Sequence, residues 1–395
     1  MIETFHNQEE YFKNHDNFCY DCSFAPERAS LGSFTTGDLE EELKSLVWAT
    51  PDDIYGSGKS YLFKGDASPY DVSQGYLGNC YFLAAAAALA EKVEVIKDLF
   101  EENAVSTTGF YNIDMFIEGQ RTPIVVDEYI PVYEWNKQPA FSSSKDAGEI
   151  WIMLLEKAYS KMTGSYERTV GGTGYEALIA LSGAPAQRYR HNEYVGTLTD
   201  VLYPYAQANF PMTAGSNSHP GGEVPMPNGI VYGHAYTLLD IVKVNSGGRE
   251  VTLYKLRNPW GKSEWTGDWS DSSSKWTSTL KSQVGWTKAD DGVFFIDEAN
   301  YLNEFSISTI GFVDKSAKHT SKRISHAKGS HSIVEIDIAK DTDHIYFIAS
   351  QGTDELSGRG STYEMSNVRI VLARATGDTA NPYEYIGAAR NYSSE

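Results

Sequence analysis

The sequence lacks three features that would define large classes of protein. It has three cysteines in 395 residues, too few for a disulfide framework, and this favours a reducing compartment. Its formal net charge is -20, whereas nucleic-acid binding needs clustered basic side chains. No apolar run is long enough to cross a bilayer, and the polar start "MIETFHNQEEYFKNHDNF" is unlike a secretory signal. We therefore expect a cytoplasmic protein without a transmembrane segment that binds no nucleic acid.

The patterns along the chain divide it into four parts. Residues 1–45 are weakly periodic and form an N-terminal extension. Helical signals dominate 46–190, strand-like alternation dominates 191–315, and alternation typical of an all-β unit fills 316–395. We therefore predict an α+β fold, with a helical domain and a β-rich domain that face each other across a cleft, followed by a short all-β region.

Periodicity also predicts individual elements. One helix begins near Cys80, and a second covers 148–162. Period-two alternation predicts strands within 110–133, 230–244, 249–260, 292–297, 305–312, 331–339, 344–350 and 368–374. The stretch "GSNSHPGGEVPMPNG" is rich in glycine and proline, so we expect it to be a loop beside the cleft.

A lone cysteine, Cys80, stands between a glycine-bearing turn and an alanine run in "GYLGNCYFLAAAAALAE". The unpaired N–H groups and the dipole of a helix that starts there stabilise a thiolate, the form of cysteine that acts as a nucleophile. Gln74 lies six residues upstream, where its amide could face a developing oxyanion. The alternative is a small buried cysteine that only packs.

A thiolate nucleophile needs a base and a residue that orients the base. The predicted strands at 230–244 and 249–260 carry His234 and Asn258, and the turn "NSGG" between them predicts a hairpin with these two residues nearly opposite each other, unless a bulge shifts the register. An asparagine carbonyl can hold one imidazole nitrogen while the other faces a thiol. Taken singly, each residue could be an ordinary strand histidine or turn asparagine.

Several long motifs resemble the calpain family of papain-like cysteine proteases. "QGYLGNCYFLAA" is similar to the family's cysteine segment, and "GHAYTL" and "RNPWGKSEWTGDWSDSSSKW" are similar to its histidine and asparagine segments. "WIMLLEKAYSKMTGSYE", "GGTGYEAL" and "DDGVFFIDEANYLNEF" also resemble the family's core. The likeness spans about residues 46–315 in the family's order, and it implies a papain-like two-domain protease core.

The resemblance implies a role for each matching residue. Cys80 matches the nucleophile, His234 the general base and acid, Asn258 the residue that orients the imidazole, and Gln74 the oxyanion-hole side chain. The family's substrate-binding glycines and its tryptophan between the domains match Gly172, Gly233 and Trp260. The implied activity is limited cleavage of intracellular proteins by a calcium-dependent endopeptidase.

The resemblance also implies two calcium sites, one in each core domain. Calcium prefers several oxygen ligands, so carboxylates and carbonyls in loops are the candidates. The first site matches Asp71 and Glu149 with the main-chain carbonyls of Lys64 and Asp66; the second matches Glu264, Asp271 and Asp291 with the carbonyl of Ala289. Val293 stands where the family usually has another acid, so we expect calcium at the first site in preference to the second.

Other departures from the family pattern leave alternatives open. Asn79 and Tyr81 flank the cysteine where the family usually has Asp and Trp, and Asp66 replaces a common glycine. Asn79, Tyr81 and Val293, together with the short C-terminal part, leave open a catalytically silent, calcium-responsive scaffold. Acyl transfer of the transglutaminase kind is a further alternative, although those enzymes usually pair His with Asp. Cys19 and Cys22 form a C-x-x-C after His15, which no second cysteine pair completes as a zinc site.

The last predicted part, 316–395, matches a β-sandwich only incompletely because it is short for a complete one. No complete EF-hand loop occurs in the sequence. The resemblance is therefore to an atypical calpain without the EF-hand domain. We expect a monomer that acts on protein substrates and recruits no EF-hand small subunit.

Overall fold

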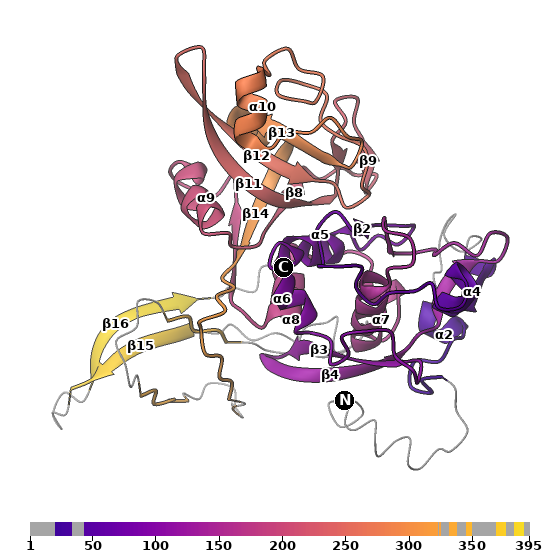
Figure 1. Cartoon of the computed structure of the whole chain (residues 1–395). Coiled ribbons are helices and arrows are strands. Elements are labelled where there is room, and N and C mark those ends of the chain that lie inside the picture. Colours follow the sequence, from indigo (N-terminus) through magenta and orange to yellow (C-terminus); the bar gives the residue numbers. More distant parts are fainter. Residues whose placement is uncertain are drawn as a thin grey trace. The chain divides into compact units, whose positions relative to one another are not determined.

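The computed structural model describes residues 20–33, 43–322, 324, 332–337, 345–349, 369–376 and 383–390. It forms two compact units, one ending at Thr320 and one beginning at Ser321. Helices and strands are mixed, and most of them belong to the first unit (Figure 1). Among the described residues, no helix is both long enough and apolar enough to span a bilayer.

The first half of the larger unit is built around two buried helices, α5 and α7, and α5 begins with Cys80 (Figure 1). Its helices are α2 (Arg28–Leu31), α4 (Pro51–Tyr55), α5 (Cys80–Ala90), α6 (Val93–Lys97), α7 (Trp151–Thr163), the 3-10 turn η2 (Glu167–Thr169) and α8 (Gly174–Ser182). Its strands are β1 (Leu46–Ala49), β2 (Val72–Ser73), β3 (Phe110–Ile117), β4 (Gln120–Asp127), β5 (Ile130–Tyr133) and β6 (Ser143–Ser144).

Helix α5 confirms the helix predicted to begin near Cys80. All of its residues are buried, and its five consecutive alanines are strong helix formers that let neighbouring elements approach closely. Helix α7 confirms the second predicted helix and ends at Gly164, whose φ of 106° suits a glycine C-cap. Strands β3, β4 and β5 confirm the alternation predicted in 110–133.

Helix α7 buries two charged side chains, and both are paired. Lys157 donates to Asp127 and to the carbonyl of Tyr129, while Lys161 donates to Asp21 and to the carbonyl of Val125. The Asp21 N–H in turn donates to Asp127 over 2.7 Å. A buried charge is tolerated only when it is paired in this way, so the network ties the segment around Asp21 to α7 and β4.

The second half of the larger unit is a six-stranded antiparallel sheet in the order β13-β12-β11-β8-β14-β7. Its strands confirm those predicted within 230–244, 249–260, 292–297 and 305–312. The elements are β7 (Ala186–Arg190), α9 (Leu198–Gln207), β8 (Met212–Ser216), β9 (Val224–Pro225), β10 (Val231–Tyr232), β11 (Ala235–Ser246), β12 (Arg249–Arg257), α10 (Ser278–Val284), β13 (Val293–Asp297), α11 (Glu298–Glu304) and β14 (Phe305–Gly311). Strand β7 belongs to this sheet although it precedes residue 191.

The hairpin of β11 and β12 confirms the predicted turn, but its register is displaced from the expected one. Gly247 and Gly248 form the tight turn, and the pair Ser246–Arg249 closes it. The register shifts again at an irregularity between Leu238 and Asp240. The position of the turn displaces the pairing from the expected one, and the bulge reverses only part of this displacement. The ladder ends with Thr237 opposite Arg257, so it stops before His234 and Asn258.

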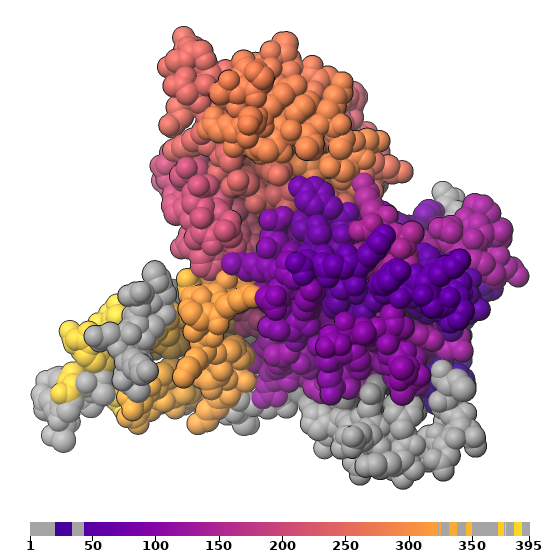
Figure 2. Space-filling view, viewed as in Figure 1, coloured from indigo at the N-terminus to yellow at the C-terminus, as the bar shows by residue number. Residues whose placement is uncertain are grey.

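Helix α5 joins the two halves of the larger unit by packing on β8 and β11. Thr237 donates to the carbonyl of Ala84 over 2.9 Å, and the buried Arg257 donates to the carbonyl of Val72 over 2.7 Å. Figure 2 shows the surfaces of the two halves, purple and rose to orange, in direct contact. The start of α5 therefore lies beside the strands that carry the histidine and asparagine segments.

The described part of the smaller unit contains one antiparallel hairpin, β15 (Arg369–Ala375) with β16 (Tyr383–Arg390). Strand β15 confirms the strand predicted at 368–374. The sequence also predicts strands at 331–339 and 344–350. For the described residues of these stretches, 332–337 and 345–349, the prediction is wrong, because they have no regular structure. Ile333 and Ile345 are exposed there, so the apolar alternation is not matched by burial against a sheet. The remaining residues of these predicted strands lie outside the described part.

Candidate active site

Cys80 is the first residue of α5, where the backbone N–H groups have no partner within the helix. Its side chain is nearly buried, with the residue 8% exposed. The Sγ atom accepts a hydrogen bond from the backbone N–H of Ala235 on β11 over 3.4 Å. The thiol of the first half therefore touches the strand that begins immediately after His234.

His234 lies between β10 and β11, and neighbouring strands hold its backbone. Its N–H donates to Ser216 Oγ, and its carbonyl accepts from the Ser216 N–H, each over 3.0 Å. The residue is 2% exposed, and its ring lies 4.9 Å from the ring of Trp260, centroid to centroid. Trp260 therefore packs against the imidazole.

Asn258 follows the end of β12 and is hydrogen-bonded to one edge of the imidazole. His234 Nε2 and Asn258 Oδ1 are 2.9 Å apart, and the same oxygen accepts from the Trp260 N–H over 3.0 Å. Asn258 Nδ2 donates to the carbonyl of Ser263 over 3.2 Å. With its oxygen facing the ring, the amide fixes the hydrogen on Nε2. The displaced register therefore still allows the predicted contact between Asn258 and the imidazole.

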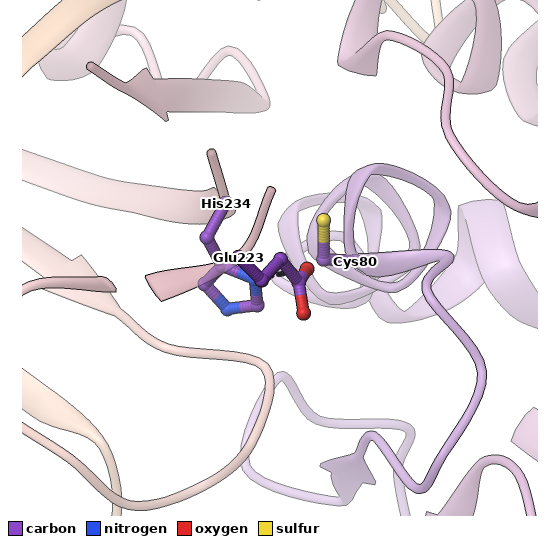
Figure 3. A group of neighbouring side chains, drawn as sticks. All are labelled: Cys80, Glu223 and His234. Carbon is purple, nitrogen blue, oxygen red and sulfur yellow. Dashed lines mark hydrogen bonds and ion pairs between the residues drawn. The ribbon is translucent and has the colours of Figure 1, made fainter. Parts of the chain in front are cut away.

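Glu223 is the residue that sequence reasoning missed. It directly precedes β9 in the glycine- and proline-rich loop, and its Oε1 lies 2.8 Å from His234 Nδ1. The Sγ of Cys80, a carboxylate oxygen of Glu223 and a ring nitrogen of His234 lie within 4.8 Å of one another. Figure 3 shows the carboxylate on the side of the imidazole that faces Cys80. A single acid in a polar loop carries no sequence signal of such a contact.

The electrostatics of this cluster favour a charged imidazole. Burial by itself lowers the pKa of His234, but Cys80 and Glu223 outweigh burial and raise this pKa to about 10. Burial raises the pKa of Glu223, whereas its hydrogen bond and charge interaction with His234 lower it, and the net shift is downward. The imidazole thus donates from both nitrogens, to Glu223 and to Asn258.

The structure also describes Gln74, Gly233 and Gly172, the remaining residues that the sequence predicts for the site. Gln74 uses Nε2 to donate to the carbonyl of Leu77 over 2.8 Å, and its Oε1 is buried with no hydrogen-bond partner. Gly233 has a φ of 68°, and its N–H donates to the carbonyl of Asn217 over 2.7 Å. A Cβ on Gly172 would lie 2.4 Å from the ring of Tyr81, so only glycine fits there.

Two of the predicted first-site acids come together, with one that sequence reasoning missed. Carboxylate oxygens of Asp71, Glu149 and Asp146 lie within 4.8 Å of one another. Burial, and then repulsion from Glu149, raise the pKa of Asp71 to about 6. The backbone N–H of Lys64 donates to Glu149 over 2.8 Å, whereas the side chain of Asp66 pairs with Lys97. Asp146 lies three residues before Glu149, which is the only signal that the sequence offers.

The predicted second-site acids lie close enough together for their charges to shift the pKa of Glu264. Burial, and next the charges of Asp271 and Asp291, raise the pKa of Glu264 to about 7. Glu264 Oε1 accepts from the N–H groups of Asp291 and Gly292 over 3.2 and 2.9 Å. The backbone of Ala289 is hydrogen-bonded to Asp271, and burial raises the pKa of that acid. A cavity of about 250 Å³ is lined by Asp271, Asp291 and also Val293, the residue that replaces an acid.

The predicted C-x-x-C can be described only in part. Cys22 is exposed, and its thiol lies 4.0 Å from the carbonyl of Tyr20. Cys19 and His15 lie outside the described residues.

Comparisons with known proteins agree with this geometry. Residues 19–311 match the model of the calpain family of cysteine proteases. The chain is 37% identical to human calpain-14 over 289 residues, which is 71% of this chain and 41% of calpain-14. It is 36% identical to the calpain-type cysteine protease DEK1 of Arabidopsis thaliana over 299 residues, 72% of this chain and 14% of that protein. It is 33% identical to Drosophila melanogaster calpain-A over 278 residues, 66% of this chain and 33% of calpain-A.

The chain spans less than half the length of each of these relatives. The matched region contains Cys80, His234 and Asn258, the three residues that the structure brings together at the start of α5. The family match supports cysteine peptidase activity. The chain therefore belongs to the calpain family of cysteine proteases.

Proposed function

We propose that the chain is a calcium-dependent cysteine endopeptidase that makes limited cuts in intracellular proteins through Cys80, His234 and Asn258. The observation that carries this proposal is the buried imidazole of His234, which is held by Asn258 at 2.9 Å beside the cysteine at the start of α5. A nucleophile, a base and a residue that orients the base are the parts that acyl transfer needs.

In the proposed reaction, the Cys80 thiolate attacks the peptide carbonyl carbon, a C–S bond forms, and the carbonyl electrons move to oxygen. The Gln74 amide and the Cys80 N–H stabilise this oxyanion. The C–N bond then breaks, and His234 gives its Nδ1 proton to the leaving amine. Next, His234 takes a proton from water, which attacks the acyl carbon and releases the acid and the thiolate.

Glu223 must move away from the imidazole before this reaction can proceed. Its bond to His234 Nδ1 uses the nitrogen that must exchange protons with substrate. Because about 30% of the Glu223 side chain is exposed and the residue lies in a loop, a local rearrangement can withdraw it without moving the sheet. Withdrawal of Glu223 is therefore the step that prepares the proposed triad.

We also propose that calcium binds at the Asp71 cluster. The fit is chemical, because three carboxylates within 4.8 Å form an all-oxygen donor set. Burial, together with repulsion from Glu149, raises the pKa of Asp71 to about 6. Asp71, Glu149 and Asp146, with the carbonyls of Lys64 and Asp66, would hold the ion, whose charge would relieve this repulsion. Glu264, Asp271, Asp291 and the carbonyl of Ala289 form the candidate second site.

Cleavage of casein by the full chain, with and without calcium, tests the proposal, with Cys80→Ala as the control. We expect cleavage with calcium, loss of cleavage on chelation, and none by Cys80→Ala. Cleavage that continues in Cys80→Ala would contradict the assigned nucleophile, and equal cleavage with and without calcium would contradict calcium dependence. We place the protein in the cytoplasm as a monomer acting on protein substrates without a small subunit; light scattering of the purified chain tests the monomer.

The second candidate is a catalytically silent, calcium-responsive binding protein. The observation that favours it is that Glu223 engages His234 Nδ1 while Cys80 Sγ accepts from the Ala235 N–H. A folded chain that cleaves casein under no calcium condition would support this candidate.

A further inference from the structure

Three side chains with metal-binding atoms converge at the start of α5 from three separate segments. The Sγ of Cys80, a carboxylate oxygen of Glu223 and a ring nitrogen of His234 all lie within 4.8 Å of one another (Figure 3). From this geometry we propose that they form a binding site for a divalent transition metal such as Zn²⁺, and that the bound ion blocks the peptidase. The inhibitory part rests on the proposed function, whereas metal binding does not.

The donor set selects the kind of ion. A thiolate, an imidazole nitrogen and a carboxylate oxygen are all ligands that zinc accepts. Calcium and magnesium are hard cations that prefer oxygen ligands throughout, so this set does not suit them. The site is thus chemically distinct from the all-carboxylate cluster of Asp71, Asp146 and Glu149.

The imidazole is already held in the orientation that a metal ligand needs. Asn258 Oδ1 lies 2.9 Å from His234 Nε2, and this contact fixes the hydrogen on that nitrogen. The amide is itself fixed, because its oxygen also accepts from the Trp260 N–H and its Nδ2 donates to the Ser263 carbonyl. The lone pair for an ion is then on Nδ1, the nitrogen that faces Glu223. Such outer contacts orient a metal-ligating histidine and strengthen its binding.

The positions need only small adjustments. Bond lengths of about 2.0–2.3 Å in a tetrahedral zinc site separate the ligand atoms by roughly 3.3–3.6 Å. The Nδ1–Oε1 distance is 2.8 Å, and no pair among the three groups exceeds 4.8 Å. The ion would replace the proton that Nδ1 shares with Glu223, and the partly exposed Glu223 side chain can absorb the shift. Three protein ligands leave the fourth position for water.

Binding at this site would remove both reacting groups at once. The ion would take the Cys80 thiolate electrons that attack the substrate and the His234 Nδ1 lone pair that accepts the proton. Glu223, which has no part in the proposed triad, would supply the third ligand. A zinc-loaded chain would therefore be inactive until the ion is removed.

Calorimetric titration of the full chain with Zn²⁺ alone, in excess calcium, tests the site. Glu223→Gln and Cys80→Ala each remove one ligand, and Glu250→Gln is the matched control at an exposed position on β12. We expect Glu223→Gln to weaken one zinc site by roughly tenfold to a hundredfold, Cys80→Ala to abolish it, and Glu250→Gln to leave it unchanged. Zinc bound elsewhere, for example at the exposed Cys22, remains in every variant.

A second readout identifies the ligands without any need for activity. Co²⁺ titrated into the wild-type chain should give thiolate-to-metal charge-transfer absorption; the part that comes from this site disappears in Cys80→Ala and weakens in Glu223→Gln, whereas any part from the exposed Cys22 remains in every variant. Zinc affinity that is equal in wild type and both ligand variants would overturn the proposal. So would a wild-type chain without the cobalt absorption.

The two proposals fail separately. If the chain binds zinc through Cys80 but never cleaves casein, the peptidase proposal fails and the metal-site proposal stands. If the chain cleaves casein but binds no zinc at Cys80, only the metal-site proposal fails. In an active chain, zinc should inhibit casein cleavage in excess calcium, and a zinc-selective chelator should restore it; full activity with the site loaded would overturn the inhibitory role.

Discussion

Replacing Glu156 with glutamine should change how the stability of the larger unit depends on pH. Glu156 lies on α7 and is 3% exposed. Its carboxylate accepts from Asn79 Nδ2 over 2.7 Å and from the Ser142 N–H and hydroxyl over 3.0 and 2.8 Å. Burial outweighs these hydrogen bonds and raises the pKa of Glu156 from 4.5 to about 7. The carboxylate therefore connects α7 to the residue that precedes Cys80.

The sign and the size follow from this pKa. Between pH 4.5 and about 7, the unfolded chain has released a proton that the folded chain keeps. The free energy of unfolding therefore falls as pH rises through this window, and it is unaffected by this group below and above it. A shift of roughly 2.5 units corresponds to about 3 kcal/mol. Glutamine cannot ionise, so Glu156→Gln should remove this fall.

Urea unfolding followed by tryptophan fluorescence at several pH values measures the effect. All eight tryptophans precede residue 320, so the signal reports on the larger unit. The substitution also leaves a mismatched donor, which costs about 1–3 kcal/mol at every pH, so the slope and not the offset is the readout. Glu193→Gln, at an exposed position, is the control. A difference between wild type and Glu156→Gln that stays constant from pH 4.5 to 7.5 would refute the reasoning.

Three further predictions concern the proposed triad, the core and the calcium cluster. Asn258→Ala removes the oxygen that accepts from His234 Nε2 and Trp260 N–H, so kcat/KM on casein should fall by about 10²–10⁴-fold; an unchanged value would contradict its orienting role. Lys157→Met leaves the fully buried Asp127 without its partner and should lower the free energy of unfolding by about 3–5 kcal/mol, whereas Lys275→Met breaks an exposed pair and should cost less than about 1 kcal/mol; equal losses would count against the buried network. Asp71→Asn keeps a side chain of similar shape but removes a charge, so half-maximal casein cleavage should need about tenfold more calcium, and an unchanged requirement would exclude Asp71 as a ligand.

The elements that the sequence predicts well are those whose local pattern and burial agree. Helix α5 has both a glycine-bearing turn before it and a run of alanines, and every residue of the helix is buried. The alternation in β3 and β4 matches their alternating burial, and the paired glycines locate the β11–β12 turn. In these cases local preference and tertiary packing favour the same structure.

The failures come from features that depend on distant contacts. The register of β11 and β12 depends on which residues close the turn, here Ser246 opposite Arg249, and on a bulge near Leu238 that no residue pattern announces. Glu223 reaches His234 through the course of the loop before β9, which no local pattern fixes. In 332–337 and 345–349, apolar alternation predicted strands, but alternation alone does not provide a partner strand.

Covalent labelling of the intact chain tests the proposed nucleophile and base most directly. The chain is incubated with a peptidyl epoxide in the presence of calcium, and the site and rate of labelling are read by mass spectrometry. We expect one adduct, on Cys80, that forms far more slowly in His234→Ala. Labelling of the exposed Cys22 at the same rate as Cys80, or a rate that is unchanged in His234→Ala, would contradict the assignment.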